Sequence, residues 1–217
     1  MRPLHNGCVH ELIRQVTKEG VVSLLPELVL RLAPEPIAPW EATERHAGSI
    51  QGPPFWAHAW PGGLALARLV LDGPALVKGK RVLDFASGCG VSAIAAMKAG
   101  ASEVFATEID AFAIAAIEEN AALNQVAVQV RSDDVVGRDE GWHTVLVGDV
   151  FYQAELSRQV MAWLQKLHAR GAEVRIGDPG RSFLPMELLE CVATYAVIPV
   201  PAWDSVVDRP ARVWRLR

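Results

Sequence analysis

A glycine-containing turn with an acidic residue before it is the segment of this sequence best suited to chemistry. Residues 82–90 have the sequence VLDFASGCG and join a predicted buried strand to a predicted helix. Gly88 and Gly90 let the backbone approach a ligand closely, and the start of the following helix offers free N–H groups. Ser87 lies in the same turn. Such a turn can bind a nucleotide cofactor, or it can be only a tight connection between a strand and a helix.

Asp84 narrows the choice of ligand. It lies at the end of the strand, where a dinucleotide-binding enzyme would place its pyrophosphate. A carboxylate fixed there would repel a diphosphate. S-adenosylmethionine has no phosphate and carries a positively charged sulfonium and amino group, so it suits an acid at this position. We therefore expect S-adenosylmethionine as the cofactor, with a dinucleotide-binding oxidoreductase or a non-catalytic nucleotide sensor as the alternatives.

Further acids follow the next two predicted strands. Glu108 ends the second strand, where nucleotide-binding sheets place a carboxylate for the ribose hydroxyls. Asp110 competes for this role, but we expect it to cap the next helix. Asp133 follows the third strand and is the candidate for contact with the adenine amino group. Its alternative role is that of a solvated loop acid beside Asp134.

The elements that must position these residues alternate along the chain. Strands are predicted at 81–85, 104–107, 126–130, 144–147 and 173–176, and helices at 64–71, 91–98, 111–120 and 155–169. This alternation predicts an α/β fold, a Rossmann-like, doubly wound and mostly parallel sheet. Residues 193–200 and 211–216 form two more predicted strands without a helix between them, which indicates a C-terminal antiparallel hairpin.

An N-terminal extension, residues 1–63, is expected to precede the compact domain of residues 64–217. Apolar residues have helical spacing over 8–19, and alternate as in a half-buried strand over 28–32. Residues 33–63 are rich in proline and aromatic side chains, which predicts little regular structure. A long aromatic-rich loop of this kind is typical of a lid or a recognition surface.

Composition limits the class of protein. The 217 residues fit one domain, and a net charge of −4 with only five lysines argues against nucleic-acid binding. The three cysteines and six histidines show neither disulfide nor metal-ligand spacing, so we expect a cytoplasmic protein without a metal. The apolar stretch at 21–32 is interrupted by Pro26, Glu27 and Arg31, and we expect no membrane association.

Four segments together resemble a known family. They are PFWAHAWPGG at 54–63, the glycine loop at 84–90, GDVFY at 148–152 and IGDPGR at 176–181. The chain resembles the seven-strand, class I, S-adenosylmethionine-dependent methyltransferases, and more narrowly the lysine methyltransferases of the electron transfer flavoprotein β subunit. The resemblance covers residues 23–180. The glycine loop identifies only the large class, whereas the other three segments together are narrower.

The resemblance implies roles for individual residues. Trp60 would flank the cofactor, and Gly148 would lie against it. Asp149 and Tyr152 match an Asp-x-x-Tyr element that lines the lysine channel; a helix cap and a buried ring are their alternative roles. We expect Asp149 to accept a hydrogen bond from the lysine amine and to orient its lone pair. Tyr152 would form a wall of the channel, and the Trp60 face would stabilise positive charge.

The resemblance also implies a protein substrate, the β subunit of electron transfer flavoprotein, with a ribosomal protein as the alternative. Two departures from the family pattern concern the site. Glu108 stands where many relatives carry aspartate, and the residues beyond Arg181 match only loosely. His58 lies within the first motif, and we expect it to be structural, with the relay of a proton as its alternative role.

Overall fold

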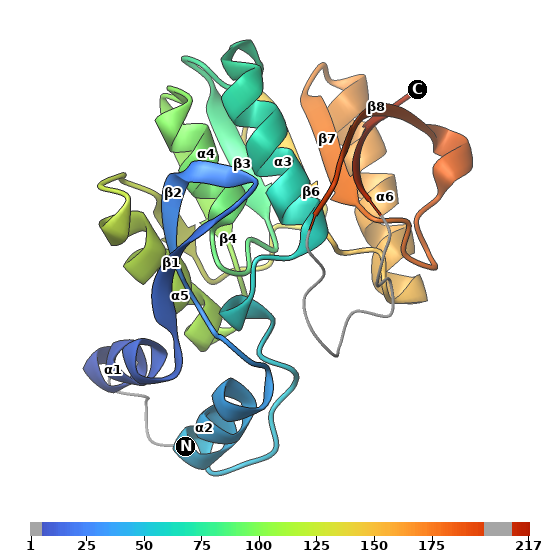
Figure 1. The fold of residues 1–217 in the computed structure, drawn as a ribbon. Helices are drawn as coiled ribbons and strands as arrows, with labels where there is room; N and C mark the ends of the chain where they lie inside the picture. Colours follow the sequence, from blue (N-terminus) through green and yellow to red (C-terminus); the bar gives the residue numbers. More distant parts are fainter. Residues whose placement is uncertain (1–5, 198–209) are drawn as a thin grey trace.

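A seven-stranded sheet forms the centre of the protein. The computed structural model describes residues 6–197 and 210–217, with side chains from residue 9 onward. The strands of the sheet are β3 (Arg81–Phe85), β4 (Glu103–Thr107), β5 (Gln129–Arg131), β6 (Thr144–Gly148), β7 (Glu173–Asp178), β8 (Leu189–Tyr195) and β9 (Ala211–Leu216). Their order is β5-β4-β3-β6-β7-β9-β8 (Figure 1). Strands β3 to β7 pair in parallel, and β9 is antiparallel to β7 and β8. The predicted mostly parallel sheet with an antiparallel C-terminal hairpin is confirmed.

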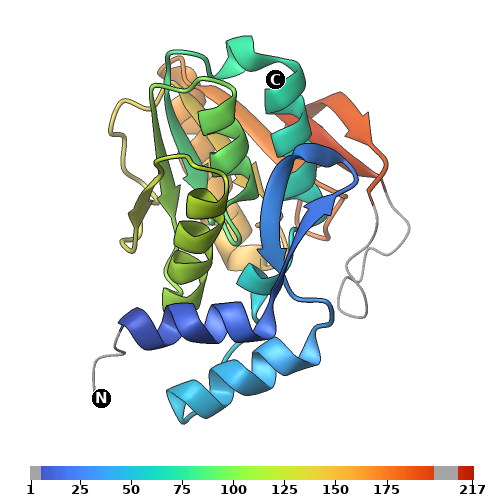
Figure 2. The ribbon, with the colours of Figure 1, turned by 60° about the vertical axis from the view of Figure 1, so that its left-hand side comes forward.

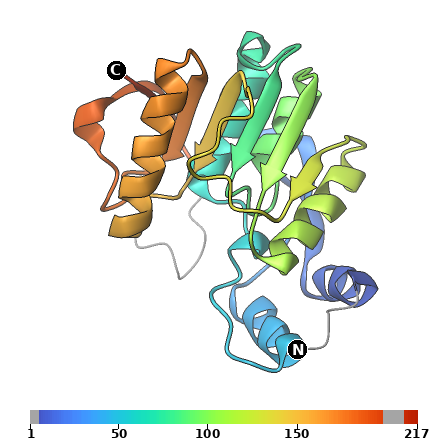
Figure 3. The same ribbon diagram turned by 180° about the vertical axis from the view of Figure 1, so that it is seen from behind.

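Helices cover both faces of this sheet. They are α3 (Pro61–Asp72), α4 (Val91–Lys98), α5 (Ala111–Leu123) and α6 (Ala154–Ala169), with short 3-10 turns η1 (Phe55–Ala57), η2 (Pro74–Leu76) and η3 (Met186–Leu188). Side chains alternate between the faces along each strand. Val82 and Leu146 share an apolar cluster with α3 and α4, whereas Leu83 and Val145 share another with α6. Figure 3 shows α6 on the face opposite α3.

The N-terminal extension packs against the sheet domain over its described part. It contains α1 (Asn6–Val16), the antiparallel hairpin of β1 (Lys18–Val22) and β2 (Leu25–Leu32), and α2 (Ile37–Ala47). Asn120 of α5 accepts the amide of Arg31 at 2.7 Å, and the Asn124 side chain bonds both the amide and the carbonyl of Val29. These bonds satisfy backbone groups of an edge strand that would otherwise be unpaired. Helices α1 and α2 lie together at one end of the molecule (Figure 2).

The prediction of little regular structure over residues 33–63 is wrong for α2. Pro36 stands at the N-cap and Pro39 in the first turn, where a missing amide hydrogen breaks no helical bond. The Glu35 carboxylate accepts hydrogen bonds from the first two amides of the helix, at 2.9 and 2.8 Å. Gly48 ends the helix in the left-handed conformation. The prolines therefore mark a helix start in this segment.

The ends of the other elements differ modestly from prediction. Helix α3 begins at Pro61, three residues before the predicted 64, so the glycines of the first motif belong to its first turn. Strand β8 begins at Leu189 instead of 193, and the predicted residues 198–200 lie outside the described residues. In the part of the chain that the structure describes, no helix is long and apolar enough to cross a membrane.

Candidate active site

The turn after β3 has the backbone of a ligand-binding loop. Ala86, Gly88 and Gly90 all have positive φ angles, of 52°, 57° and 83°. A Cβ on Gly90 would lie 3.2 Å from the side chain of Ile117, so both the conformation and the packing favour glycine there. At Gly88 no atom of the described residues lies within 4 Å of the same position, which leaves open space beside the turn. A hollow lies over this turn at the carboxyl ends of β3 and β6.

Most of the predicted site residues line this hollow together. They are Trp60, Asp84, Ser87, Gly88, Gly148 and Asp149. Gly90 lies beside them as the N-cap of α4. His58, expected to be structural, also lines the hollow; its ring is buried, and burial lowers its pKa. The structure therefore brings residues from segments far apart in the sequence to one place.

Asp84 is a buried carboxyl group at the bottom of the hollow. It accepts hydrogen bonds from the Ser87 hydroxyl and from the Ala93 amide, the latter at 3.0 Å. Burial raises its pKa to about 7, and the negative charge of Glu108 acts in the same direction. No cation among the described residues offsets this burial. A positively charged ligand would therefore favour the ionised form of Asp84.

Glu108 lies beside the glycine turn on the neighbouring strand. One carboxylate oxygen accepts the Gly88 amide at 2.8 Å, and the other accepts the Ile109 amide at 3.2 Å. Burial raises the pKa of Glu108. Asp110 is the N-cap of α5 and accepts the Phe112 amide at 2.8 Å, which confirms its predicted capping role.

The Asp133 carboxylate forms ion pairs with arginines outside the hollow. It pairs with Arg131 at 2.7 Å and with Arg138 at 2.5 Å. The bond from Arg131 is the main reason that its pKa falls to about 2. Asp133 does not line the hollow, and these ion pairs match the alternative of a loop acid. Its contact with adenine stays a prediction.

The three narrower motifs meet where α3 begins. The Asp149 carboxylate accepts the Gly63 amide at 3.1 Å and also bonds the Gly62 amide. Its own amide donates to the Gly177 carbonyl of β7 at 2.9 Å. Asp149 adopts a positive φ of 58°, which non-glycine residues seldom do. It therefore caps α3, one of the roles left open for it.

Arg181 is a partner of Asp149 that the sequence analysis did not identify as a site residue. Its Nη2 and Nε lie 2.7 and 3.2 Å from Asp149 Oδ1, and both side chains are 10% exposed. The guanidinium also lies over the Trp60 ring, with 5.6 Å from Cζ to the centroid. Burial raises the pKa of Asp149, and the Arg181 charge opposes that shift. The signal available in the sequence was the arginine that closes the last motif.

Asp178 is a second residue that sequence reasoning missed. It is fully buried, and its Oδ1 accepts the amides of Gly180 and Arg181, both at 2.7 Å. Among the described residues, its Oδ2 has no hydrogen-bond partner. Burial raises its pKa to about 6, and the nearby charge of Asp149 adds to the shift. Asp178 thus fixes the backbone from which the Arg181 side chain extends.

Tyr152 stands at the rim of the site and does not line the hollow. It is 43% exposed, and its ring lies 5.8 Å from that of Phe55. Phe55 in turn lies 5.6 Å from Trp60, and the Trp60 indole donates to the Phe55 carbonyl at 2.8 Å. Phe55 and Tyr152 therefore form an exposed aromatic rim next to Trp60.

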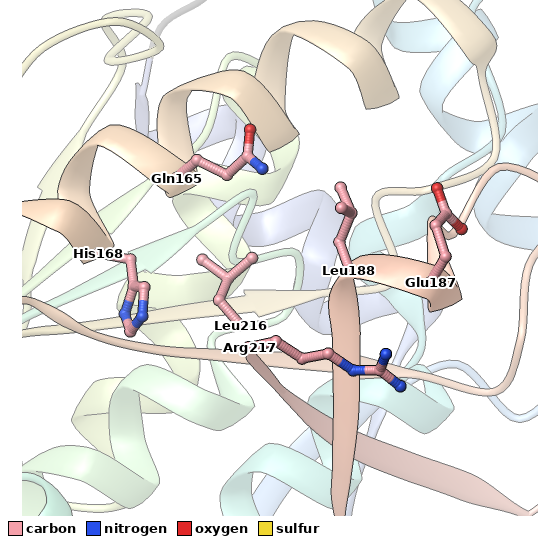
Figure 4. A pocket seen from close by; sticks show the side chains of 6 residues that line it. All are labelled: Gln165, His168, Glu187, Leu188, Leu216 and Arg217. Carbon is pink, nitrogen blue, oxygen red and sulfur yellow. The ribbon is translucent and has the colours of Figure 1, made fainter.

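A second hollow, of about 300 Å³, lies near the C-terminal end of α6 (Figure 4). Its walls come from Gln165 and His168 of α6, from η3, from Leu216 at the end of β9 and from Arg217 after it. It lies toward the amino ends of the parallel strands, whereas the glycine turn lies at their carboxyl ends, because α6 and β9 both run antiparallel to these strands. Among the described residues, no group of three or more His, Cys, Asp or Glu side chains could hold a metal.

Comparison with known proteins identifies the family. The electron transfer flavoprotein beta subunit lysine methyltransferase of Xenopus laevis is 40% identical over 178 residues, which cover 81% of this chain and 72% of the frog protein. The chain belongs to this family. The human member is 41% identical over 171 residues, covering 77% of this chain and 63% of its own length. A homolog from Caenorhabditis elegans is 30% identical over 198 residues, covering 83% and 80%.

Other matches concern the larger class. The family described as "Ribosomal protein L11 methyltransferase (PrmA)" matches residues 68–157. The enzyme of that name from Thermotoga petrophila is 40% identical over 75 residues, covering 35% of this chain and 28% of the relative. The tRNA (uracil-54, C5)-methyltransferase of Pyrococcus abyssi, solved with S-adenosyl-L-homocysteine, has a TM-score of 0.56 at 15% identity, covering 93% of this chain and 44% of that one. A putative RNA methyltransferase from Pyrococcus horikoshii has a TM-score of 0.51 at 17% identity, covering 76% and 89%. These structures support the class I methyltransferase fold.

Proposed function

We propose that this protein transfers methyl groups from S-adenosylmethionine to lysine side chains of the β subunit of electron transfer flavoprotein. The relatives that match most of this chain carry that activity in their names. One structural observation carries the proposal. The three motifs of residues 60–63, 148–152 and 177–181 converge at the start of α3, beside the glycine turn. The residues on which the resemblance depends therefore build one site.

The residues of the hollow fit S-adenosylmethionine. Asp84 is buried with a raised pKa and no cation to offset it among the described residues, so a cationic ligand complements it. Glu108 provides a carboxylate beside the open space at Gly88, which suits ribose hydroxyls. A dinucleotide would bring a diphosphate against both acids, which is unfavourable. When bound, S-adenosylmethionine supplies an activated methyl group on its sulfonium.

The protein's own residues would bind and orient the lysine. A free lysine has a pKa of about 10.4, so its amine must lose a proton before its lone pair can react. Partial burial and neighbouring positive charge both lower that pKa. Asp149 would accept a hydrogen bond from the amine and aim its lone pair, while Phe55 and Tyr152 would hold the alkyl chain. Most of the acceleration would come from this orientation.

A ribosomal protein is the second candidate substrate. The match to the L11 methyltransferase family favours it, but that match covers only residues 68–157. It includes the glycine turn and Asp149, and it omits both the segment around Trp60 and the one around Arg181. The flavoprotein enzymes match 74–83% of the chain, so their matches extend well beyond residues 68–157. The flavoprotein is therefore the better supported substrate.

A direct test offers purified flavoprotein β subunit and ribosomal proteins side by side, with radiolabelled S-adenosylmethionine. Label is expected on lysine of the flavoprotein, located by mass spectrometry. A Glu108→Ala variant serves as the control with weakened cofactor binding. Its matched control is Glu187→Ala, which removes an exposed acid remote from the glycine turn. Label on ribosomal protein alone would transfer the proposal to that substrate. RNA and DNA are offered in a parallel reaction, and label on nucleic acid alone would refute lysine methylation.

The class of cofactor has its own test. S-adenosylhomocysteine is expected to raise the melting temperature, whereas NAD and FAD are not. Stabilisation by NAD or FAD would instead favour the oxidoreductase or the nucleotide sensor.

We also propose a cytoplasmic location, supported by the free thiols of Cys89 and Cys191. Fractionation of the source cells checks it.

A further inference from the structure

The Asp149 carboxylate already has as many hydrogen bonds as it can accept. Arg181 donates twice to Oδ1, and the amides of Gly62 and Gly63 are the backbone donors. A carboxylate offers about four lone-pair positions. A lysine amine can therefore bond to Asp149 only if one of these donors leaves.

The two backbone donors cannot leave. A Cβ built on Gly62 would lie 2.1 Å from the Gly177 carbonyl oxygen, and one built on Gly148 would lie 3.1 Å from the Gly63 nitrogen. The first turn of α3 is thus in direct contact with β6 and β7, so its amides are fixed. Arg181 donates through a long side chain with several rotatable bonds. It is the donor that can move.

Arg181 also contacts the second group expected to receive the lysine cation. Its guanidinium carbon lies 5.6 Å from the centroid of Trp60, and Trp60 lines the hollow with Asp149. An aromatic face and a carboxylate together form a binding place for one cation. In this structure that cation is Arg181.

We propose that Arg181 is an internal stand-in for the acceptor lysine, which exchanges with it between Asp149 and Trp60. This inference rests on the proposed function. The exchange replaces one cation beside the buried Asp149 with another while the lysine enters, which avoids an uncompensated buried charge at that step. Arg181 then determines specificity, because a neutral side chain cannot replace it. After exchange the lysine loses a proton to solvent, its nitrogen lone pair bonds to the methyl carbon, and the carbon–sulfur bond breaks with its electron pair remaining on sulfur.

The most direct test makes residue 181 itself a possible acceptor of the methyl group. In the R181K variant a lysine amine replaces the guanidinium beside Asp149. With labelled S-adenosylmethionine and no other protein, we expect methylation of residue 181, at a rate per molecule independent of protein concentration. The matched control is R175K, the same substitution on β7 in a side chain that is 17% exposed and paired with Glu173. No label is expected at residue 175.

A second test empties the position. In R181A, n-butylamine, a mimic of the lysine side chain, is expected to bind, to raise the melting temperature and to be methylated. When Arg181 is displaced from Asp149 in only about a tenth of the wild-type molecules, the apparent affinity of wild type for butylamine is about tenfold lower than that of R181A. We therefore expect R181A to methylate butylamine about tenfold faster than wild type. If R181A does not fold, R181K alone decides, since it retains a cation.

The inference and the proposed function can fail separately. Both variants must first bind S-adenosylhomocysteine like wild type, as measured by calorimetry. If wild type then labels the flavoprotein while residue 181 stays unmodified in R181K and butylamine stays unmodified with R181A, Arg181 is a permanent partner of Asp149 and the inference is overturned. If wild type labels no protein lysine, the proposed function fails, whereas label at residue 181 would still support the stand-in.

Discussion

Gly62 and Gly177 meet backbone to backbone where the first turn of α3 crosses the end of β7. A Cβ built on either residue would lie 2.1 Å from the carbonyl oxygen of the other. No side chain fits between two main chains at that distance. The contact brings the free amides of α3 within reach of Asp149. Two motifs that are more than a hundred residues apart in the sequence thus depend on each other.

Substitution at this contact is expected to destabilise the protein. Gly62→Ala and Gly177→Ala should each lower the free energy of unfolding by about 1–3 kcal/mol or more, because overpacking forces the backbones apart. Urea unfolding measures the change. Gly52→Ala is the control, since nothing lies within 4 Å of its Cβ position. Equal stability of all three variants would show that α3 does not press on β7 in solution.

The Glu108 prediction concerns cofactor affinity. Glu108→Ala should weaken binding of S-adenosylhomocysteine by one to two orders of magnitude, since charged hydrogen bonds are worth about 1.5–3 kcal/mol. Glu108→Ala also loses the hydrogen bond that the Gly88 amide donates to Glu108. Glu108→Gln retains an acceptor for that amide but has no charge, so comparing the two variants distinguishes the effect of supporting the loop from the effect of the negative charge. Calorimetry measures both affinities. Unchanged affinity in Glu108→Ala would transfer the ribose role to Asp110 or remove it.

The raised pKa of Asp84 predicts a pH dependence. In the folded protein without ligand Asp84 retains its proton up to a pH of about 7, whereas an ordinary aspartate loses it near 3.8. The folded state then binds more protons than the unfolded state between these values, so stability falls as the pH rises through that range. A cationic ligand favours ionised Asp84, so its affinity should rise with pH up to about 7 and level off above.

Asp84→Asn checks this prediction. The variant should weaken cofactor binding at pH 8 and lose most of the pH dependence of affinity between 5 and 7, about tenfold per unit in wild type. Asp178, with a pKa raised to about 6, still contributes to the stability profile. Glu187→Gln, an exposed acid, should behave like wild type. Calorimetry in buffers of different ionisation enthalpy measures the proton that Asp84 releases when the ligand binds. If binding at pH 6 released no proton, the proposed ionisation of Asp84 would be contradicted.

Local patterns in the sequence were sufficient for the sheet and for the glycine turn after β3. The strand–turn–helix around Asp84 depends on residues close in sequence, so its apolar run and its glycines predict it. Helix α2 was missed because prolines near a helix start resemble those of a loop. Arg181 and Asp178 were missed as site residues because their roles arise from contacts across 32 residues or from burial, which no local pattern shows.

The Asp149 prediction separates binding of the acceptor from binding of the cofactor. Asp149→Asn retains an acceptor for the Gly63 amide and removes the charge opposite Arg181. Methyl transfer should fall about a hundredfold, the scale expected when a reacting group loses its alignment, while S-adenosylhomocysteine affinity stays within a few-fold. Asn is preferable to Ala because its side-chain oxygen can still accept hydrogen bonds from the Gly63 amide and from Arg181, whereas Ala would leave these buried donors without an acceptor.

The other half of the Asp-x-x-Tyr element is tested by paired substitutions of Tyr152. Tyr152→Ala should reduce transfer as Asp149→Asn does, because it removes the exposed ring that contacts Phe55 at the rim. Tyr152→Phe should have a milder effect, since the ring and its apolar contacts remain. Tyr195→Phe, on β8, is the control for loss of a tyrosine hydroxyl and should leave transfer unchanged. The readout is the rate of lysine methylation, with cofactor affinity measured in parallel.

Parallel loss of affinity and transfer would mean that Asp149 and Tyr152 hold the site together and do not orient the lysine. A Tyr152→Phe variant as impaired as Tyr152→Ala would instead assign the hydroxyl a direct contact with the amine.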